Sequence, residues 1–334
     1  MTDDPIARHL SRHPVLLLDG GLATELERRG ADLDHPLWSA RMLIERPEAI
    51  RALHLDYFLA GADVATTASY QASFDGLARE GHGAEEAAAL MRDAVALAIE
   101  ARAAFWSQAP QRERRAWPLV AASVGPYGAM LADGAEYRGH YGLSIDELAD
   151  FHRPRLRVLA EAGPDLLACE TLPALDEALA LARVLDETPG PPAWIAFSCR
   201  DGGHTCQGEP IEDCARALEG CTRVAAIGVN CTAPAHVGEL VRRLRAHTRK
   251  PVLAYPNSGE AWDPLGRRWL RCAGDAPFAE HAHDWYAQGA RAIGGCCRTT
   301  PQDIAALRRW ADALPRPSAP NDAASRTAGR ADGA

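Results

Sequence analysis

The sequence predicts a (β/α)8 barrel of the TIM type, and three observations lead to that prediction. Eight short apolar segments recur along the chain, and most are continuous apolar runs, as in strands buried on both faces. Helical patterns separate most of them, and alternating strands and helices form parallel sheets. Eight such units in about 300 residues favour a barrel. A doubly wound sheet is the alternative.

The eight predicted strands are the apolar runs themselves, each followed by a polar turn. They cover residues 15–18, 63–67, 119–124, 165–169, 193–198, 224–229, 251–255 and 290–293. In a barrel the carboxyl ends of all strands face one shared mouth. We therefore expect the polar residues that follow these strands to converge there.

The predicted helices lie between and after the strands, and some have recognisable caps. Ser144, followed by Glu147, has the pattern of a capping box. Thr300 can cap the last helix, where Pro301 suits the first helical position. The predicted helices cover residues 46–59, 84–105, 144–161, 175–185, 212–218, 236–247, 278–288 and 301–314.

Two connections, 126–143 after the third strand and 258–277 after the seventh, are too long to be simple turns. Both leave strand ends at the mouth, so we expect lids or substrate walls there, with decorative loops as the alternative. Residues 1–314 are predicted to form a single barrel domain. Residues 315–334 lack an apolar pattern and are predicted to be a disordered tail.

Composition indicates an ordinary globular protein. The chain is 47% hydrophobic and 24% charged, and its net charge of −9 with no basic block argues against nucleic acid. No run approaches the roughly 20 apolar residues of a membrane helix, and the first residues do not resemble a signal peptide. We therefore expect the nine cysteines to be reduced thiols in the cytoplasm. The sequence does not distinguish a monomer from a small homo-oligomer.

Three cysteines stand where predicted strands end. Cys231 follows the sixth strand, and Cys296 and Cys297 follow two glycines after the last one. Glycines let another group approach the backbone closely. Three thiols without a matched fourth ligand indicate a zinc site with one open position, as in catalytic rather than structural zinc sites.

The alternative is that cysteines here are ordinary buried thiols, since free cysteine is often buried. We prefer that interpretation for Cys169, Cys199, Cys206, Cys214, Cys221 and Cys272. A disulfide between the neighbours Cys296 and Cys297 would be strained. His281 and His283 have no partner in the pattern, so we expect them at the surface.

Two carboxylates also stand at strand ends. Asp19 precedes two glycines after the first strand, where it binds a ligand or only caps the next helix. Glu170 follows the fourth strand, where an unpaired buried carboxylate would be costly. A cationic group of a ligand would compensate the charge of Glu170, and so would a structural arginine such as Arg200. The other strand-end residues are Thr66, Thr67, Gly125, Asn230 and Asn257.

With these residues assembled, the sequence resembles the homocysteine S-methyltransferase family over about residues 14–314. The matching stretches are LLDGGLATEL (17–26), TASYQ (67–71), SVGPYG (123–128), LADG (131–134), EYRG (136–139), ACETLP (168–173), GVNC (228–231), YPNSGE (255–260) and GGCCRTTP (294–301). The stretches SVGPYG, EYRG and YPNSGE are similar to the branch that uses S-methylmethionine.

The resemblance implies a zinc-dependent enzyme with Cys231, Cys296 and Cys297 as ligands, which act in catalysis by activating the substrate thiol. The implied reaction moves a methyl group from S-methylmethionine, and also from S-adenosylmethionine as a second donor, to L-homocysteine, giving methionine. Zinc deprotonates a bound thiol. A sulfonium donor leaves as a neutral thioether, so no general acid is needed.

The resemblance also implies substrate contacts. Asp19 and Glu170 would hold the homocysteine amino group, while Thr67 and Asn230 fall at pocket-lining motif positions. Aromatic side chains are candidates to cover the sulfonium by cation–π contact. These candidates are Tyr127, Tyr137, Trp38 and Trp262.

Three alternative functions stay open. Betaine or another donor would keep the thiol activation, as would selenohomocysteine or selenocysteine as acceptor. A zinc-binding barrel of the lyase type would need a Schiff-base lysine or a metal base, and Lys250 precedes the seventh strand, at the wrong end of the barrel. A non-enzymatic zinc-binding thiol protein would bind the metal without catalysis.

Overall fold

All eight predicted strands form, and they pair in parallel in one sheet. The computed structural model describes residues 4–32, 39–108, 115–259, 261–263, 268–270 and 278–317. The sheet order is β1-β10-β7-β6-β5-β4-β3-β2. The strands are β1 (Leu16–Leu17), β2 (Val64–Thr66), β3 (Leu119–Val124), β4 (Leu166–Leu172), β5 (Ala193–Phe197), β6 (Val224–Asn230), β7 (Val252–Tyr255) and β10 (Ala290–Ile293).

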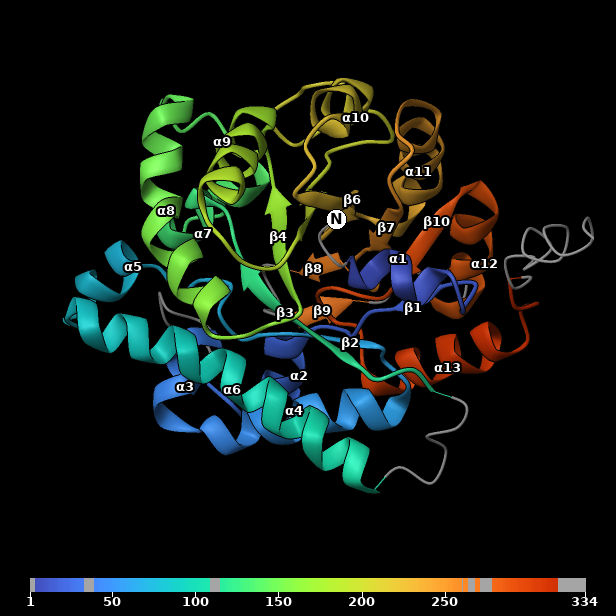
Figure 1. The fold of residues 1–334 in the computed structure, drawn as a ribbon, viewed down its shortest axis with the longest axis horizontal. Coiled ribbons are helices and arrows are strands. Elements are labelled where there is room, and N and C mark those ends of the chain that lie inside the picture. Colours follow the sequence, from blue (N-terminus) through green and yellow to red (C-terminus); the bar gives the residue numbers. More distant parts are fainter. Residues whose placement is uncertain are drawn as a thin grey trace, which may run out of the picture.

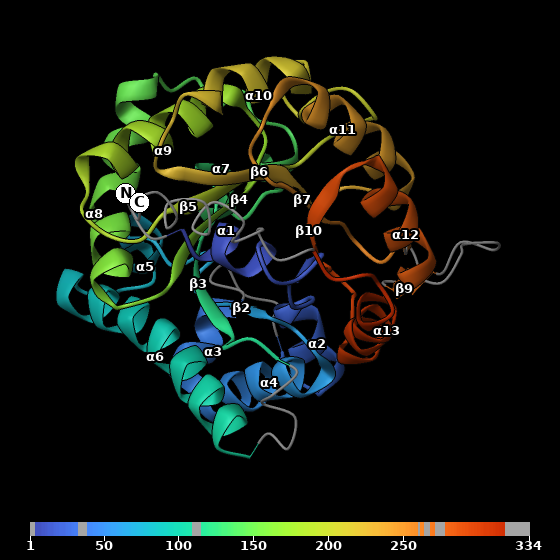
Figure 2. The same cartoon turned by 45° about the vertical axis from the view of Figure 1, so that its right-hand side comes forward.

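The sheet curls into a nearly closed barrel surrounded by helices (Figures 1 and 2). Its two ends, β1 and β2, meet through Asp63. The Asp63 N–H donates to Leu17 O at 2.7 Å, and the Leu17 N–H donates to Asp63 Oδ2 at 3.0 Å. The predicted (β/α)8 barrel is confirmed, and the doubly wound alternative is wrong.

Side chains of the strands alternate between two apolar clusters. Leu16 and Leu18 belong to the cluster inside the barrel, whereas Leu17 packs in the layer beneath the helices. This alternation is the two-residue period of a strand. Because both faces are buried, the strands read as continuous apolar runs in the sequence.

The eight predicted helices also form, and their ends lie within a few residues of the predicted ones. Both expected caps are capping boxes, Ser144 with Glu147 and Thr300 with Asp303. The helices are α4 (Pro47–Ala60), α6 (Ala84–Gln108), α8 (Ile145–Glu161), α9 (Leu175–Glu187), α10 (Ile211–Glu219), α11 (Pro234–His247), α12 (Phe278–Gln288) and α13 (Pro301–Asp312).

Several short elements were not predicted, because each is shorter than the window over which helical periodicity is visible. They are α1 (Pro5–Leu10), α2 (Leu22–Arg28), α3 (Ser39–Glu45), α5 (Phe74–Arg79), α7 (Tyr127–Leu131), η1 (Ala135–Tyr137) and the antiparallel pair β8 (Ala261–Asp263) and β9 (Arg268–Leu270). Helix α1 lies at the amino ends of the strands, where Ile6 is fully buried and His9 reaches Val15 O at 3.2 Å.

The two long connections contain structure of their own. The β3–α8 connection holds α7 and η1, and the connection after β7 holds β8 and β9. Trp38, Cys272, the Trp262 side chain and residues 318–334 of the predicted tail lie outside the described residues. Within the described ranges, no helix is both long and apolar enough to cross a membrane.

Candidate active site

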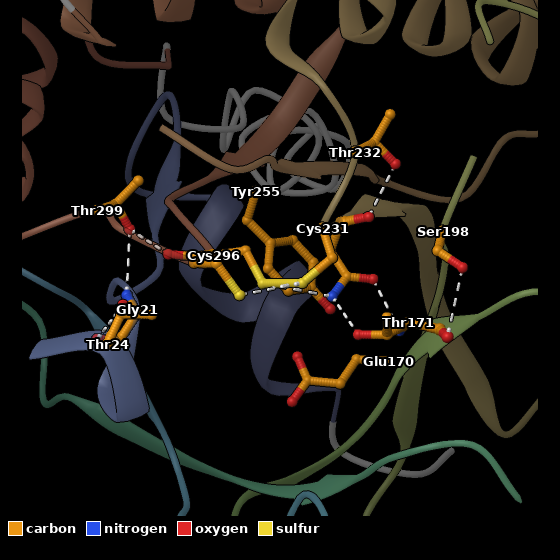
Figure 3. The surroundings of a disulfide bond; sticks show 12 residues. Gly21, Thr24, Glu170, Thr171, Ser198, Cys231, Thr232, Tyr255, Cys296 and Thr299 are labelled. Carbon is orange, nitrogen blue, oxygen red and sulfur yellow. Dashed lines mark hydrogen bonds between the residues drawn. A yellow bond between two sulfur atoms is a disulfide. The ribbon is translucent and has the colours of Figure 1, made fainter. Parts of the chain in front are cut away.

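The three predicted cysteines come together at the carboxyl ends of β6 and β10. Their sulfur atoms all lie within 4.8 Å of one another. A disulfide joins Cys231 to Cys296 (Figure 3). Cys297 is free, with its Sγ 4.0 Å from Cys231 Sγ. The prediction that all nine cysteines are reduced is therefore wrong for Cys231 and Cys296.

The cysteine cluster fits a tetrahedral metal ion once the disulfide is reduced. Zinc–thiolate bonds of about 2.3 Å place two sulfur ligands roughly 3.8 Å apart. The separation of 4.0 Å between the Cys231 and Cys297 sulfur atoms is close to that value. No fourth Cys, His, Asp or Glu joins the group in the part of the chain that the structure describes. Three thiolates would thus leave one position of the ion for a substrate.

Two glycines allow the cysteine pair to lie against the end of β1. A Cβ on Gly294 would approach Asp19 O to 2.8 Å, and one on Gly295 would approach Thr299 Oγ1 to 2.2 Å. The Gly295 N–H donates to Asp19 O at 2.9 Å. The two glycines therefore let the backbone just before Cys296 and Cys297 contact the backbone of Asp19 directly.

Asn230 ties the end of β6 to the end of β4. Its Oδ1 accepts the Thr171 N–H at 2.8 Å, and its Nδ2 donates to Thr171 Oγ1 at 2.8 Å. Thr171 and Cys231 both have left-handed backbones, with φ of 61° and 45°, which non-glycine residues rarely adopt. Asn230 is fully buried. Its amide therefore positions the neighbours Glu170 and Cys231, and its hydrogen bonds are made within the protein.

Asp19 lies at the mouth beside the end of β2. Its carboxylate accepts the Thr66 N–H at 2.7 Å and the Thr66 hydroxyl at 3.0 Å. Burial raises the pKa of Asp19 to about 8, and the nearby charge of Glu170 adds to that rise, although the bonds from Thr66 oppose it. The structure thus favours a ligand-binding or proton-binding Asp19 over a helix cap, since α2 has no side-chain cap.

Glu170 lies near the cysteine cluster (Figure 3), and its charge helps to raise the pKa of Cys297. The Ser123 hydroxyl donates to Glu170 Oε1 at 2.5 Å, and the Tyr255 hydroxyl bonds to the same carboxylate. Tyr255 in turn accepts the Trp194 Nε1–H at 3.0 Å. Burial raises the pKa of Glu170 to about 7.

Thr67 supports this arrangement indirectly. Its hydroxyl accepts the Ser123 N–H at 3.0 Å and lies 2.7 Å from the Ser69 hydroxyl. Thr67 is thereby linked to Glu170 through Ser123. Sequence reasoning found Thr67 but missed Ser123 and Tyr255, although both stand in motif stretches at strand ends.

Neither mouth carboxylate forms an ion pair with a basic side chain among the described residues. The leading causes of the pKa shifts of Asp19 and Glu170 include no cationic side chain. Arg200, the structural arginine considered for Glu170, pairs with Asp201 instead at 3.4 Å. That alternative is wrong, and the mouth is left suited to a cationic group of a ligand.

Of the other described cysteines, Cys169, Cys199 and Cys214 are buried as expected, whereas Cys206 and Cys221 are only half-buried. The described cysteines outside the cluster are free, and they are Cys169, Cys199, Cys206, Cys214 and Cys221. His281 stacks on Trp285 and His283 packs on Trp310, on the outer helices. His283 is exposed and His281 half-buried.

A family model described as homocysteine S-methyltransferase matches residues 16–311. The chain belongs to the homocysteine S-methyltransferase family. It is 50% identical over 311 residues to the homocysteine S-methyltransferase YbgG of Bacillus subtilis, a match that covers 93% of this chain and 99% of that one. Family membership confirms the predicted resemblance and the prediction that the protein is a methyltransferase enzyme.

Solved structures extend the match to the fold. Crystal structures of the homocysteine methyltransferase MmuM from Escherichia coli, in an oxidized and in a metallated form, each align with a TM-score of 0.83 and 45% identity, covering 92% of this chain and all of that one. A selenocysteine Se-methyltransferase from Brassica oleracea var. italica is 44% identical over 303 residues, covering 88% of both chains.

Proposed function

We propose that the protein transfers a methyl group from S-methylmethionine to L-homocysteine, giving methionine, and that the reaction depends on Zn²⁺. The observation that carries this proposal is the pairing of two groups at one mouth. Two buried carboxylates that have no basic partner in the described part of the chain, Asp19 and Glu170, stand beside three clustered cysteine sulfurs. Homocysteine offers both complements, an ammonium group and a thiol.

Asp19 and Glu170 bind the ammonium group in this proposal. Both carboxylates have raised pKa values because burial disfavours their charged forms. A nearby positive charge favours the ionised carboxylates, so the substrate stabilises the charge that the protein leaves uncompensated. Thr66 and Ser123 orient the two groups through their hydroxyls.

Cys231, Cys296 and Cys297 would hold the metal, after reduction of the disulfide. Bound Zn²⁺ would supply a thiolate at neutral pH, which a free thiol with a pKa of about 8.5 does only slightly. The backbone around Gly294 and Gly295 fixes the thiols next to Asp19, so the amine and the sulfur of one homocysteine are oriented together.

The methyl transfer balances without a proton donor. The homocysteine sulfur forms a new bond to the methyl carbon with its lone pair, and the donor's carbon–sulfur bond breaks. The electron pair of that bond stays on the donor sulfur, which becomes a neutral thioether. With S-methylmethionine both products are methionine. The task left to the protein is in-line placement of the two sulfurs.

A second acceptor deserves a test because the Brassica relative is named for selenocysteine. A selenol bound to a metal would also lose its proton and become an anionic nucleophile. Selenocysteine and selenohomocysteine carry the same ammonium group as homocysteine. Selenocysteine and selenohomocysteine are therefore the acceptors to compare with homocysteine.

The test is methionine formation by reduced, zinc-loaded protein with L-homocysteine and, separately, S-methylmethionine, S-adenosylmethionine or betaine. We expect turnover with S-methylmethionine. Turnover with betaine alone would replace the donor, and no turnover with any donor while zinc is bound would refute the proposed reaction.

The metal assignment has its own test. Cys297→Ser should lose zinc and activity together, because a hydroxyl is a poor replacement for a thiolate ligand. Metal content by elemental analysis and turnover are measured on the same sample. Cys206→Ser, at a free cysteine outside the cluster, is the control and should keep both. A Cys297→Ser protein with full zinc and full turnover would overturn the ligand set.

A further inference from the structure

Glu136 is a carboxylate on η1, in the β3–α8 connection that covers part of the mouth. Its backbone is fixed to the strand ends. The Ser198 hydroxyl donates to Glu136 O at 2.9 Å and lies 3.5 Å from Thr171 O. Thr171 follows Glu170 in β4. The Glu136 backbone is therefore held above the end of β4, where Glu170 is proposed to bind homocysteine.

The Glu136 side chain has a buried oxygen without a partner. Its Oε2 is inaccessible to water and has no hydrogen bond within the described part of the chain. Arg138, whose charge acts on Glu136, forms its ion pair with Asp133 at 3.1 Å. Burial raises the pKa of Glu136, and the charge of Asp133 adds to that rise, although its own backbone N–H and Arg138 oppose it. A buried acceptor of this kind costs free energy unless a ligand supplies the donor.

Glu136 lies within electrostatic reach of the reaction centre. Its charge raises the pKa of Cys297 and of the neighbouring Tyr137. A second buried acceptor at the mouth, Asn257 Oδ1, also has no partner among the described residues. Asn257 is next to Ser258, whose N–H donates to Cys297 O at 3.1 Å. The mouth therefore carries two acceptors beyond those assigned to homocysteine.

We propose that Glu136 binds the ammonium group of the methyl donor, so that the donor is recognised as a cationic amino acid. This subsite rests on the proposed function. Asp19 and Glu170 serve the ammonium group of homocysteine, and a donor that is itself an amino acid brings a second one. Glu136 is a carboxylate on the covering segment, above the strand ends, where the second substrate must enter.

The ammonium group, and not the sulfonium, is the partner that fits catalysis. The sulfonium charge disappears as the methyl group leaves, so a carboxylate against it would stabilise the ground state more than the transition state. The ammonium charge is unchanged during the reaction. Glu136 therefore contributes the same binding to both states, which affects the donor KM and not kcat.

The experiment measures donor binding by calorimetry on reduced, zinc-loaded protein. The probes are S-methylmethionine and 4-dimethylsulfoniobutanoate, which has the same sulfonium and carboxylate but no amino group. We expect Glu136→Gln to weaken S-methylmethionine binding about tenfold to a hundredfold, as for loss of a charged hydrogen bond. The same variant should bind the desamino probe as the wild type does. Asp176→Asn, which changes an exposed carboxylate in the first turn of α9, should match the wild type for both probes.

Kinetics separates this subsite from other roles of Glu136. The variant should show a raised KM for S-methylmethionine, with kcat and the homocysteine KM unchanged. A raised homocysteine KM, equal losses for both probes, or unchanged S-methylmethionine binding would each overturn the subsite. Binding that depends on Glu136 without any methyl transfer would support the subsite and refute the proposed function. Methyl transfer that does not depend on Glu136 would do the reverse.

Discussion

Two buried aspartates, at opposite ends of the barrel, have opposite electrostatics. Asp63, at the amino ends of the strands, and Asp19, at the mouth, are 3% and 4% exposed. Asp63 is surrounded by cations, with Arg308 at 2.6 Å, Arg115 at 3.4 Å and His9 at 3.7 Å. Although burial opposes it, their charges lower the pKa of Asp63. Burial raises the pKa of Asp19 to about 8.

The two aspartates differ in whether side chains of the protein neutralise their charge. The amino-terminal end compensates its carboxylate with the protein's own arginines, and Asp63 also closes the sheet through Leu17. No such cation pairs with the mouth carboxylates among the described residues, and in the proposed function a cationic substrate takes that place. Perturbed carboxylates of this second kind are typical of functional sites.

The largest expected effect comes from the same substitution at both ends. Asp63→Asn should destabilise the fold by about 3–5 kcal/mol, because it leaves two buried guanidinium groups without their anion. Asp19→Asn should cost no stability and should raise it at neutral pH, because a neutral amide avoids the desolvation of a charge that raises the pKa of Asp19 to about 8. Urea unfolding of both variants tests this. Equal losses of stability would remove the distinction between the two ends.

The second effect concerns homocysteine. Asp19→Asn and Glu170→Gln should each weaken homocysteine binding by about 1.5–3 kcal/mol, the range for a hydrogen bond to a charged group. Calorimetry with 4-mercaptobutanoate, which lacks the amino group, is the control. The variants should bind this probe as the wild type does. Equal losses for homocysteine and the probe would argue against contact with the ammonium group.

A third substitution sharpens the contrast within the mouth itself. The Asn230 side chain, like that of Asp63, finds its partners within the protein. Its hydrogen bonds hold Thr171 in a left-handed backbone conformation. Asn230→Ala should therefore cost about 1–2 kcal/mol of folding stability, for two lost hydrogen bonds. It should also weaken zinc and homocysteine binding together, because it joins the two half-sites. Unchanged stability with selective loss of homocysteine binding would instead make Asn230 a substrate contact.

The smallest effect is a slope of stability with pH. Asp19 and Glu170 have folded pKa values of about 8 and about 7, above their ordinary values, so the folded state binds more protons at intermediate pH. Stability from these groups is full below their ordinary pKa values near 4 and is lost as pH rises from there through the folded values, by at most about 1.4 kcal/mol per pH unit and group. Asp63, with a lowered pKa, contributes in the opposite sense, at acid pH. Asp19→Asn should flatten the slope between pH 6 and 8, and an unchanged slope would assign it to other groups.

The fold was largely predictable because each strand and most long helices of the barrel have a recognisable local sequence pattern. The continuous apolar runs gave all eight strands, and the Ser144 and Thr300 capping boxes placed two helix starts. The same logic placed Asp19, Glu170 and the three cysteines at one mouth. Short helices such as α7 were not predicted, since five residues are too few to show the helical period.

The pairings within the site were not predictable, because they depend on contacts between distant strands. Nothing in the spacing shows that Ser123 and Tyr255 hold Glu170, or that the Asn230 amide is used by Thr171. The Cys231–Cys296 disulfide joins residues 65 apart. The resemblance to the family placed Thr67 and Asn230 near the pocket, and the structure adds that Thr67 is hydrogen-bonded to Ser123 and Asn230 to Thr171.

The most direct measurement is the pKa of the Asp19 carboxyl group by carbon-13 NMR, assigned with Asp19→Asn, without and with saturating L-homocysteine. We predict a pKa near 8 in the free protein, which falls by about one unit or more when the substrate's ammonium group binds, as an adjacent opposite charge requires. With 4-mercaptobutanoate the value should stay near that of the free protein. An Asp19 pKa that homocysteine leaves unchanged would contradict the assignment of the mouth carboxylates to the substrate ammonium.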